Sequence, residues 1–402
     1  MNQSQSNSQL IAIIQDKIAN SPDQKITFAD YMDLVLYHPQ EGYYTSGQVD
    51  IGQAGDFFTA ASLGSDFGEL LAENFVEMWK NLGQPSPFDL VEMGAGKGEL
   101  ADDILTYLSQ HYPHCLESLH YHIIEESSAF KKEQQEKLKT WHNEVTLKWE
   151  SWDDIPNSSL VGCCFSNELV DAFPVHRVQI EAGTLKEIYV ALAEEAENSP
   201  FTEVTDILST PQLREYFQTV GVNLPSDEYP EGFQTEVNLA LPPWLATVSR
   251  CLKRGYLLTI DYGYPAKKYY NPQRYTGTLQ CYIQHQRHND PYYLIGQQDI
   301  TSHVDFTALK TYGRQYGLEF YYLTQQALFL MSSGLGDRLN QLSQGGFNIM
   351  EILQRRDALH QLIDPMGLGG FRVLLQGKGM SEVEKNTPLL GFREHSKEPP
   401  KV

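Results

Sequence analysis

The sequence predicts an α/β protein with a Rossmann-like sheet as its core. From Pro87 onward, short apolar runs alternate with amphipathic helical stretches, which is the pattern of strand–helix–strand units. The first run, residues 88–91, leads into a cluster of glycines, as expected of a strand-to-helix turn that holds a ligand. The chain has 402 residues, of which 41% are hydrophobic, so two or three domains and a sizeable core are allowed.

The first quarter of the chain has helical spacing. Residues 27–30 resemble a capping box ahead of an apolar stretch, and apolar residues between 67 and 79 recur at helical intervals up to Gly83. We therefore expect residues 1–86 to form a helical N-terminal region.

Five short apolar runs are expected to be strands of the core sheet. Helical stretches separate the first three, one of them capped by Ser127, and this order indicates parallel strands joined by crossover helices. The expected strands are residues 88–91, 121–124, 145–147, 160–165 and 255–260, with two more near 318–323 and 371–375.

A long insertion separates the fourth and fifth expected strands. Its first part contains two strand-like runs around Ala182-Gly183, which predict a β-hairpin. Residues 267–293 are rich in tyrosine and basic residues and are expected to form a lid. The expected segments are a helical N-terminal region covering the ligand site (1–86), the first half of the core (87–174), the insertion with its hairpin (175–254), the second half of the core with the lid (255–379) and a polar tail (380–402).

A glycine-rich loop carries the strongest functional signal. Gly94, Gly96 and Gly98 let the backbone pass close to a ligand, and the helix that follows offers unpaired N–H donors. A dinucleotide fingerprint reads G-x-G-x-x-G, whereas here the third glycine comes one residue early. The form E-x-G-x-G-x-G resembles that of class I S-adenosylmethionine (SAM) methyltransferases, which implies SAM as the cofactor, bound by Glu92 and by the loop that includes Ala95.

Residues after the second and third expected strands extend this nucleotide-binding pattern. Glu125 lies 27 residues after Gly98, at a strand end where a carboxylate can accept both hydroxyls of a ribose, and Glu126 is the alternative. Asp153, after the third strand, can accept a hydrogen bond from an adenine amino group, with Trp152 stacking nearby.

The segment after the fourth expected strand carries the candidate catalytic residues, because reacting groups gather at the carboxyl ends of such strands. Asn167 can orient a substrate nitrogen, while Glu168 and Asp171, three residues apart on a first helical turn, can bind a guanidinium. Alternatively, Asn167 and Asp171 cap that turn. His303, between two aspartates, is either a general base or a hydrogen-bonded structural group.

The net charge and the cysteine content restrict the binding partners and the cellular compartment expected for the protein. A net charge of −22 disfavours nucleic acids and anionic membranes and fits a protein substrate with a cationic side chain. Five cysteines without a CxxC pair, together with an N-terminus unlike a signal peptide, lead us to expect a cytoplasmic protein, and a homodimer is left open. No metal site is expected, because a histidine-rich stretch reads as a solvent-facing helix end; its members are His111, His114, Cys115, His120 and His122.

Several motifs in order along the chain resemble the MidA-like family of SAM-dependent methyltransferases. The likeness extends from about residue 26 to residue 375. The matching segments are TFADY (27–31), YHPQEGYY (37–44), GDFFT (55–59), FGE (67–69), EMGAGKG (92–98), NELVDAFP (167–174), IDYG (260–263) and DITSHVDF (299–306).

This resemblance implies a seven-stranded methyltransferase core with a helical N-terminal region folded over the SAM site, and it places Asp56 and Thr59 at the border of the cofactor. Mitochondrial members of the family assist assembly of respiratory complex I by symmetric dimethylation of an arginine. The leading hypothesis is therefore a SAM-dependent protein arginine methyltransferase. The alternatives are a small-molecule methyltransferase on the same core, or an assembly factor that binds SAM and catalyses nothing.

Overall fold

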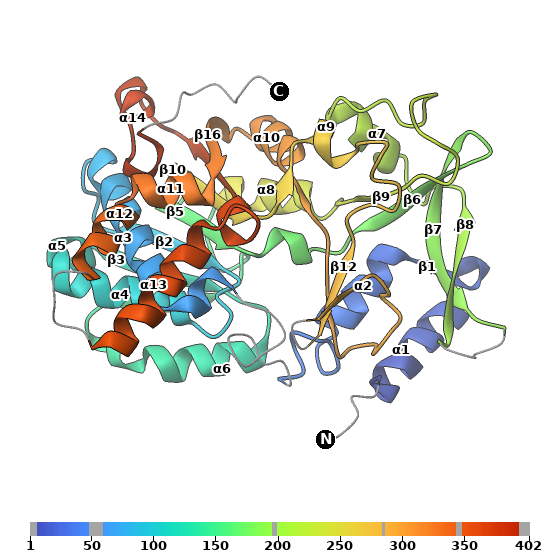
Figure 1. The fold of residues 1–402 in the computed structure, drawn as a ribbon, viewed down its shortest axis with the longest axis horizontal. Helices are drawn as coiled ribbons and strands as arrows, with labels where there is room; N and C mark the ends of the chain where they lie inside the picture. Colours follow the sequence, from blue (N-terminus) through green and yellow to red (C-terminus); the bar gives the residue numbers. More distant parts are fainter. Residues whose placement is uncertain (1–5, 48–58, 195–198, 284–285, 343–347, 394–402) are drawn as a thin grey trace. The chain divides into compact units, whose positions relative to one another are not determined.

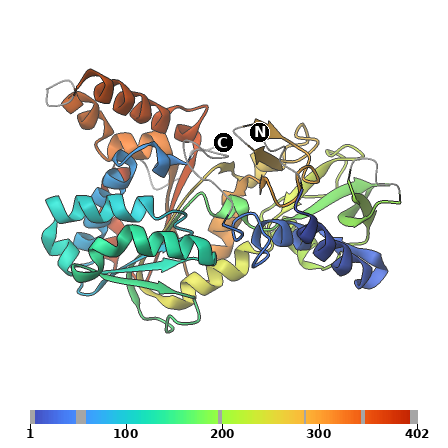
Figure 2. The same cartoon turned by 90° about the horizontal axis from the view of Figure 1, so that it is seen from below.

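The computed structural model describes residues 6–47, 59–194, 199–283, 286–342 and 348–393. The chain forms two compact units (Figures 1 and 2). The sheet unit consists of Phe58–Leu169, Leu245–Tyr262 and Tyr312–Val402, and the N-terminal unit consists of Met1–Phe57, Val170–Trp244 and Gly263–Thr311. The expected 1–86 region is therefore divided between the two units; that it covers a cofactor stays a prediction.

The sheet unit is built on a mixed sheet of seven strands, in the order β16-β17-β10-β5-β2-β3-β4. Strands β10, β5, β2, β3 and β4 pair in parallel, and β17 pairs antiparallel with both β10 and β16. The expected α/β class is thus confirmed. The strands are β2 (Phe88–Met93), β3 (Leu119–Ile124), β4 (Thr146–Glu150), β5 (Leu160–Asn167), β10 (Leu252–Asp261), β16 (Glu319–Gln325) and β17 (Arg372–Lys378).

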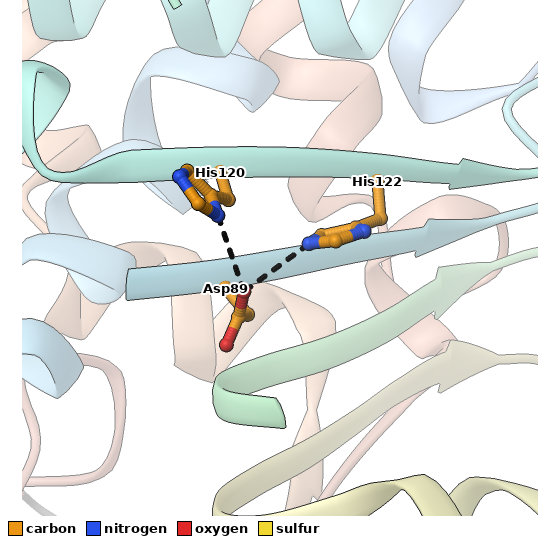
Figure 3. A group of neighbouring side chains, drawn as sticks. All are labelled: Asp89, His120 and His122. Carbon is orange, nitrogen blue, oxygen red and sulfur yellow. Dashed lines mark hydrogen bonds and ion pairs between the residues drawn. The ribbon is translucent and has the colours of Figure 1, made fainter. Parts of the chain in front are cut away.

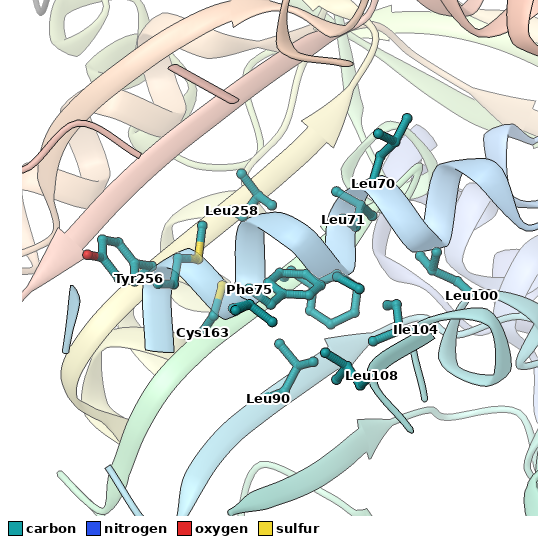
Figure 4. Packing of buried hydrophobic residues seen from close by; sticks show 14 of the residues in the cluster. Leu70, Leu71, Phe75, Leu90, Leu100, Ile104, Leu108, Cys163, Tyr256 and Leu258 are labelled. Atoms are coloured by element: carbon teal, nitrogen blue, oxygen red, sulfur yellow. The ribbon is translucent and has the colours of Figure 1, made fainter. Parts of the chain in front are cut away.

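The largest hydrophobic core lies between this sheet and the helices α3 (Asp66–Asn81) and α4 (Glu99–His111). The Phe75 ring of α3 lies 4.9 Å from the Phe165 ring of β5, tilted by 47°. Leu90 of β2 and Ile104 of α4 are fully buried near Phe75 (Figure 4). Alternate residues of each strand face this core, as the pleat requires. The remaining helices of this unit are α5 (Pro113–Glu117), α6 (Ser128–Lys137), α11 (Gln326–Ser332), α12 (Leu335–Leu342), α13 (Ile349–Ile363) and α14 (Glu382–Asn386). Helices α8 (Leu241–Cys251) and α10 (Phe306–Gln315) begin in the N-terminal unit and end in the sheet unit.

The N-terminal unit has its own sheet, in the order β1-β7-β6-β9, with β8 added to β7. The predicted hairpin is confirmed, because β6 and β7 pair antiparallel around Ala182 and Gly183, whose φ values of 50° and 70° are those of a type I′ turn. Its elements are α1 (Ser8–Ala19), β1 (Lys25–Thr27), α2 (Phe28–Tyr37), β6 (His176–Glu181), β7 (Thr184–Leu192), β8 (Phe201–Asp206), α7 (Gln212–Thr219) and β9 (Gln234–Val237).

Both predicted helix caps are present. The Asp30 N–H donates to the Thr27 hydroxyl at 3.0 Å at the start of α2, and the Phe130 N–H donates to the Ser127 hydroxyl at 3.3 Å at the start of α6. These bonds satisfy N–H groups that a helix start leaves without intrahelical partners.

The tyrosine-rich segment expected to form a lid belongs to the N-terminal unit; that it acts as a lid stays a prediction. Tyr269 and Tyr270 are buried, and the Tyr269 hydroxyl donates to the buried Glu236 carboxylate at 3.2 Å. Aromatic side chains held in this way fix the segment to its own unit. Its elements are β11 (Gly263–Tyr264), α9 (Ala266–Tyr269), β12 (Gln280–Ile283), β13 (Gln286–His288), β14 (Asp299–Thr301) and β15 (Val304–Asp305).

Candidate functional site

The glycine-rich loop connects β2 to α4, as the sequence predicts. All three glycines have left-handed backbone, with φ values of 71° at Gly94, 51° at Gly96 and 76° at Gly98. A Cβ atom at Gly94 would lie 2.8 Å from the Leu169 side chain, whereas a Cβ atom at Gly96 would have no protein atom within 4 Å. The loop is therefore packed against the protein at Gly94 and open at Gly96, where a ligand can approach the backbone.

Glu125 directly follows β3 and lies beside this loop, because β2 and β3 run in parallel and the Gly94 N–H donates to the Ile124 carbonyl at 3.0 Å. One carboxylate oxygen accepts from the Ser127 N–H at 2.9 Å and the other from the Gln134 amide at 3.1 Å. Burial raises the pKa of Glu125. Its neighbour Glu126 is exposed, so Glu125 is the carboxylate that the structure brings to the loop.

Gln134 is a site residue that the sequence did not reveal. Its buried side chain donates to the Gly96 carbonyl at 2.7 Å as well as to Glu125, and it accepts a hydrogen bond from the Trp149 indole at 3.0 Å. It therefore fixes the position of the carboxylate relative to the open glycine. The one available signal was its spacing four residues after Phe130, which places both on the buried face of α6.

Glu92 lies on the core side of β2. It is 3% exposed and accepts a hydrogen bond from the Tyr121 hydroxyl at 2.7 Å. Burial raises its pKa to about 7. Its described contact is thus with the neighbouring strand rather than with the loop.

Trp152 and Asp153 follow β4, the edge strand next to β3. Trp152 is half-buried, and its carbonyl accepts from the Arg250 guanidinium at 2.9 Å. Asp153 is exposed. Both lie after the carboxyl end of a strand of the parallel set, as a ligand-binding residue of such a sheet should.

The end of β5 gathers polar groups. Asn167 and the Ala60 N–H both donate to the same Glu168 carboxylate oxygen, at 3.2 and 3.1 Å. Within the described part of the chain, three buried oxygens here have no hydrogen-bond partner, those of the Asn167 amide, the Ser166 hydroxyl and the Thr259 hydroxyl. An acceptor buried without a donor is unfavourable, so these atoms are suited to bind a polar ligand.

The expected helical turn carrying two carboxylates is not formed. Glu168 has a left-handed backbone with φ of 52°, and only Val170–Ala172 follows as a 3-10 turn. Asp171 belongs to the N-terminal unit, where its carbonyl accepts from the Ser302 N–H at 2.9 Å. The prediction that Glu168 and Asp171 share a helix face is therefore wrong, because the chain leaves one unit for the other between them.

His303 also belongs to the N-terminal unit, and its ring lies 5.2 Å from that of Tyr264. Burial, followed by the charges of Arg274, Arg287 and Lys268, lowers its pKa to about 4. The ring is therefore neutral at physiological pH and a weak base, which does not support a general-base role.

Of the two residues implied to border the cofactor, Asp56 lies outside the described residues. Thr59 lies in the sheet unit directly before the 3-10 helix Ala60–Leu63, and its carbonyl accepts from the Ser62 hydroxyl at 2.8 Å. The adjacent Ala60 N–H reaches Glu168, so Thr59 is next to the end of β5.

Together these groups fit a nucleotide-like ligand such as SAM. The open backbone at Gly96, the carboxylate of Glu125 and the unpaired amide oxygen of Asn167 follow three neighbouring strands of the parallel set. Glycine accommodates close approach, a carboxylate accepts paired hydroxyls, and an amide oxygen accepts an N–H.

Comparisons with known proteins agree with this site. Residues 70–324 match the family model Methyltransf_28, described as "Putative S-adenosyl-L-methionine-dependent methyltransferase". The chain is 30% identical over 398 residues to a Drosophila melanogaster protein named protein arginine methyltransferase NDUFAF7 homolog, mitochondrial, covering 91% of this chain and 85% of that protein. It is 28% identical to the rat NDUFAF7 protein, covering 79% and 72%.

A solved structure supports the same relationship. The crystal structure of a Burkholderia thailandensis protein bound to S-adenosyl-homocysteine superimposes with a TM-score of 0.82 at 28% identity, covering 96% of this chain and 95% of that one. This neighbour supports SAM as the cofactor of the present chain, because S-adenosyl-homocysteine is SAM without its transferable methyl group.

The comparisons also correct one prediction. The cytoplasmic setting expected from the sequence is contradicted, because the relatives from Drosophila and rat are both named mitochondrial. Among the helices of the described ranges, none combines the length and the apolar character that crossing a bilayer requires. With a family model that matches more than half of its length, this chain belongs to the Methyltransf_28 family and is a SAM-dependent methyltransferase.

Proposed function

We propose that this protein methylates a guanidinium nitrogen of an arginine side chain in a protein substrate. The named activity of its relatives, protein arginine methyltransferase, supports this substrate class. The net charge of −22 favours the approach of a cationic substrate. The observation that carries the proposal is the buried, unpaired amide oxygen of Asn167, since it can accept a hydrogen bond from an N–H of the acceptor.

The cofactor residues proposed for this chain are those around the glycine-rich loop. Glu125, with Glu126 as the less buried alternative, accepts the ribose hydroxyls, while the backbone from Gly94 to Gly98, including Ala95, passes along the ligand. Trp152 and Asp153 flank the adenine, and Thr59 borders the cofactor. Glu92 acts indirectly, through its bond to Tyr121 on the next strand.

The acceptor groups proposed are Asn167 and Glu168. Bound SAM supplies a methyl group on a positively charged sulfur, which is already activated toward attack by a nitrogen lone pair. Asn167 orients that nitrogen through its amide oxygen, and the Glu168 carboxylate, held by the Ala60 N–H, stabilises the positive charge of the guanidinium. Such alignment is the main task that remains for the protein in this reaction.

Methyl transfer from labelled SAM to proteins of a cell extract tests the proposal. We expect label on arginine of a protein, and we expect Asn167→Ala to reduce the transfer rate about a hundredfold through misalignment of the acceptor. The same variant should bind S-adenosyl-homocysteine within a few fold of the wild type. Asn143→Ala, at an exposed asparagine, is the matched control.

The same experiment distinguishes the alternatives. Label found only in small molecules would refute a protein acceptor in favour of a small-molecule methyltransferase. Cofactor binding without any transfer would indicate an assembly factor that has lost catalysis.

A further inference from the structure

Asp89 and His120 lie near the amino ends of β2 and β3, at the end of the sheet opposite the glycine-rich loop, and a second histidine, His122, and a second carboxylate, Glu150 of β4, lie further along the strands. Asp89 is the second residue of β2, whereas the loop follows its last residue, and Asp89 is paired with His120 in the parallel register of β2 and β3. His122 is two residues further along β3, so its side chain projects from the same sheet face. Figure 3 shows both rings directed at the Asp89 carboxylate.

The distances are those of a chelating group. The Asp89 Oδ1 atom lies 3.2 Å from Nε2 of His122 and 3.9 Å from Nδ1 of His120, and the three ligand atoms are within 4.8 Å of one another. The other oxygen of Asp89 accepts the Val161 N–H at 2.8 Å. This bond fixes the carboxylate and leaves Oδ1 directed at both rings.

The second ring nitrogen of His122 is held by a further carboxylate. Nδ1 lies 2.6 Å from an oxygen of Glu150 on β4. If this nitrogen carries the proton, Nε2 presents a lone pair to Asp89 Oδ1, and two acceptors at 3.2 Å repel each other unless a cation lies between them. A metal-bound histidine commonly donates its other N–H to a carboxylate in this manner.

We propose that Asp89, His120 and His122 bind a divalent transition-metal ion of the zinc type, with water in the remaining position. Two imidazole nitrogens and one carboxylate oxygen form a donor set that suits Zn²⁺. Glu150 is a positioning residue that orients His122. The ion joins β2 to β3 and, through Glu150, to β4, so its role is to stabilise this edge of the sheet.

The geometry needs a small adjustment. Tetrahedral ligands about 2.0–2.1 Å from zinc lie about 3.3 Å apart, and the contact between Asp89 and His122 already has this spacing. His120 must approach Asp89 by about 0.6 Å, and any wider separation among the three ligand atoms, which lie within 4.8 Å of one another, must close as well; the His120 side chain can move in this way because it is 35% exposed.

The test uses the full-length protein, with any affinity tag removed and metals stripped by a chelator. Titration with Co²⁺ and Zn²⁺ should give one tightly bound ion per chain, with the visible absorption of tetrahedral Co²⁺. His120→Ala should weaken this binding at least tenfold, because it removes a ligand at a half-exposed position. His114→Ala, at a histidine with an 89% exposed side chain, is the control and should leave affinity unchanged.

A second measurement guards against loss of fold in the variants. Zn²⁺ should raise the melting temperature of the wild type and of His114→Ala but not of His120→Ala, while the far-ultraviolet circular dichroism of all three stays the same. Absence of stoichiometric Co²⁺ binding by the folded wild type would overturn the proposal and assign the cluster to a protonated His122 between two carboxylates. Equal affinity of wild type and His120→Ala would overturn it as well.

Discussion

Replacement of Gln134 by alanine tests whether this side chain holds the cofactor-binding residues in place without itself contacting the cofactor. The side chain makes three hydrogen bonds, to the Gly96 carbonyl, to the Glu125 carboxylate and from the Trp149 indole. A neutral bond contributes about 1 kcal/mol and a bond to a charged group about 2 kcal/mol. Since such losses are not additive, Gln134→Ala should lower the free energy of unfolding by roughly 2–4 kcal/mol.

The effect on ligand binding follows from the freedom that Glu125 gains. Without Gln134, the carboxylate keeps only backbone donors, among them the Ser127 N–H, and loses its side-chain donor, so it can rotate away from a ribose. Loss of one charge-assisted hydrogen bond corresponds to about 2 kcal/mol, or roughly a thirtyfold weaker affinity. We expect isothermal titration calorimetry with S-adenosyl-homocysteine to show this increase in Kd.

Two further variants make the experiment decisive. Gln134→Met keeps most of the side-chain volume and removes the hydrogen bonds, so it should bind the ligand as poorly as Gln134→Ala. Gln135→Ala changes an exposed residue of the same helix and should behave as the wild type. A Kd for Gln134→Ala within twofold of the wild type, or full recovery in Gln134→Met, would refute the reasoning.

Two shorter predictions concern the same strand and loop. Gly96→Ala should lower the free energy of unfolding by about 1–2 kcal/mol, because Gly96 has a positive φ. It should also abolish ligand binding measured by calorimetry. The control is Gly83→Ala, at a glycine that also has a positive φ and open space around it, and this variant should lower stability without affecting ligand binding. The carboxyl of Glu92 has its pKa raised from 4.5 to about 7, so the protonated form is favoured by folding. Relative to Glu92→Gln, the stability of the wild type should therefore be greatest below pH 4.5 and fall by roughly 3 kcal/mol as the pH rises to 7, as measured by urea unfolding across that range. A constant difference between the two proteins would contradict this assignment.

The sequence predicted those parts of the fold that depend on local pattern. The strands were recognisable from short apolar runs, the hairpin from Ala182-Gly183 and the cap of α6 from Ser127, because each signal lies within a few residues of the structure that it specifies. Glu125 was found because a carboxylate after the second parallel strand is expected to lie beside the loop after the first, with which that strand pairs.

The residues that the sequence did not place depend on packing between distant segments. Gln134 lies in a polar helix, and only its spacing four residues after Phe130 distinguishes it from the exposed Gln135, which is too weak a signal to assign it to the site. The pairing of Glu168 with Asp171 assumed a regular helix, but Glu168 adopts a left-handed backbone that only glycine and a few polar residues tolerate without strain. Neither the role of Gln134 nor the left-handed backbone of Glu168 can be predicted from the spacing of apolar residues along the sequence.

The histidine cluster and the cofactor loop are consequences of one strand register. In the observed pairing of β2 with β3, Asp89 is opposite His120, and the Gly94 N–H reaches the Ile124 carbonyl next to Glu125. A slip by one residue would turn every side chain of one strand to the other face, separating Asp89 from both histidines and moving Glu125 away from the loop. A metal ion held at the amino ends of these strands would therefore stabilise the register on which ligand binding at their carboxyl ends depends, without touching the ligand.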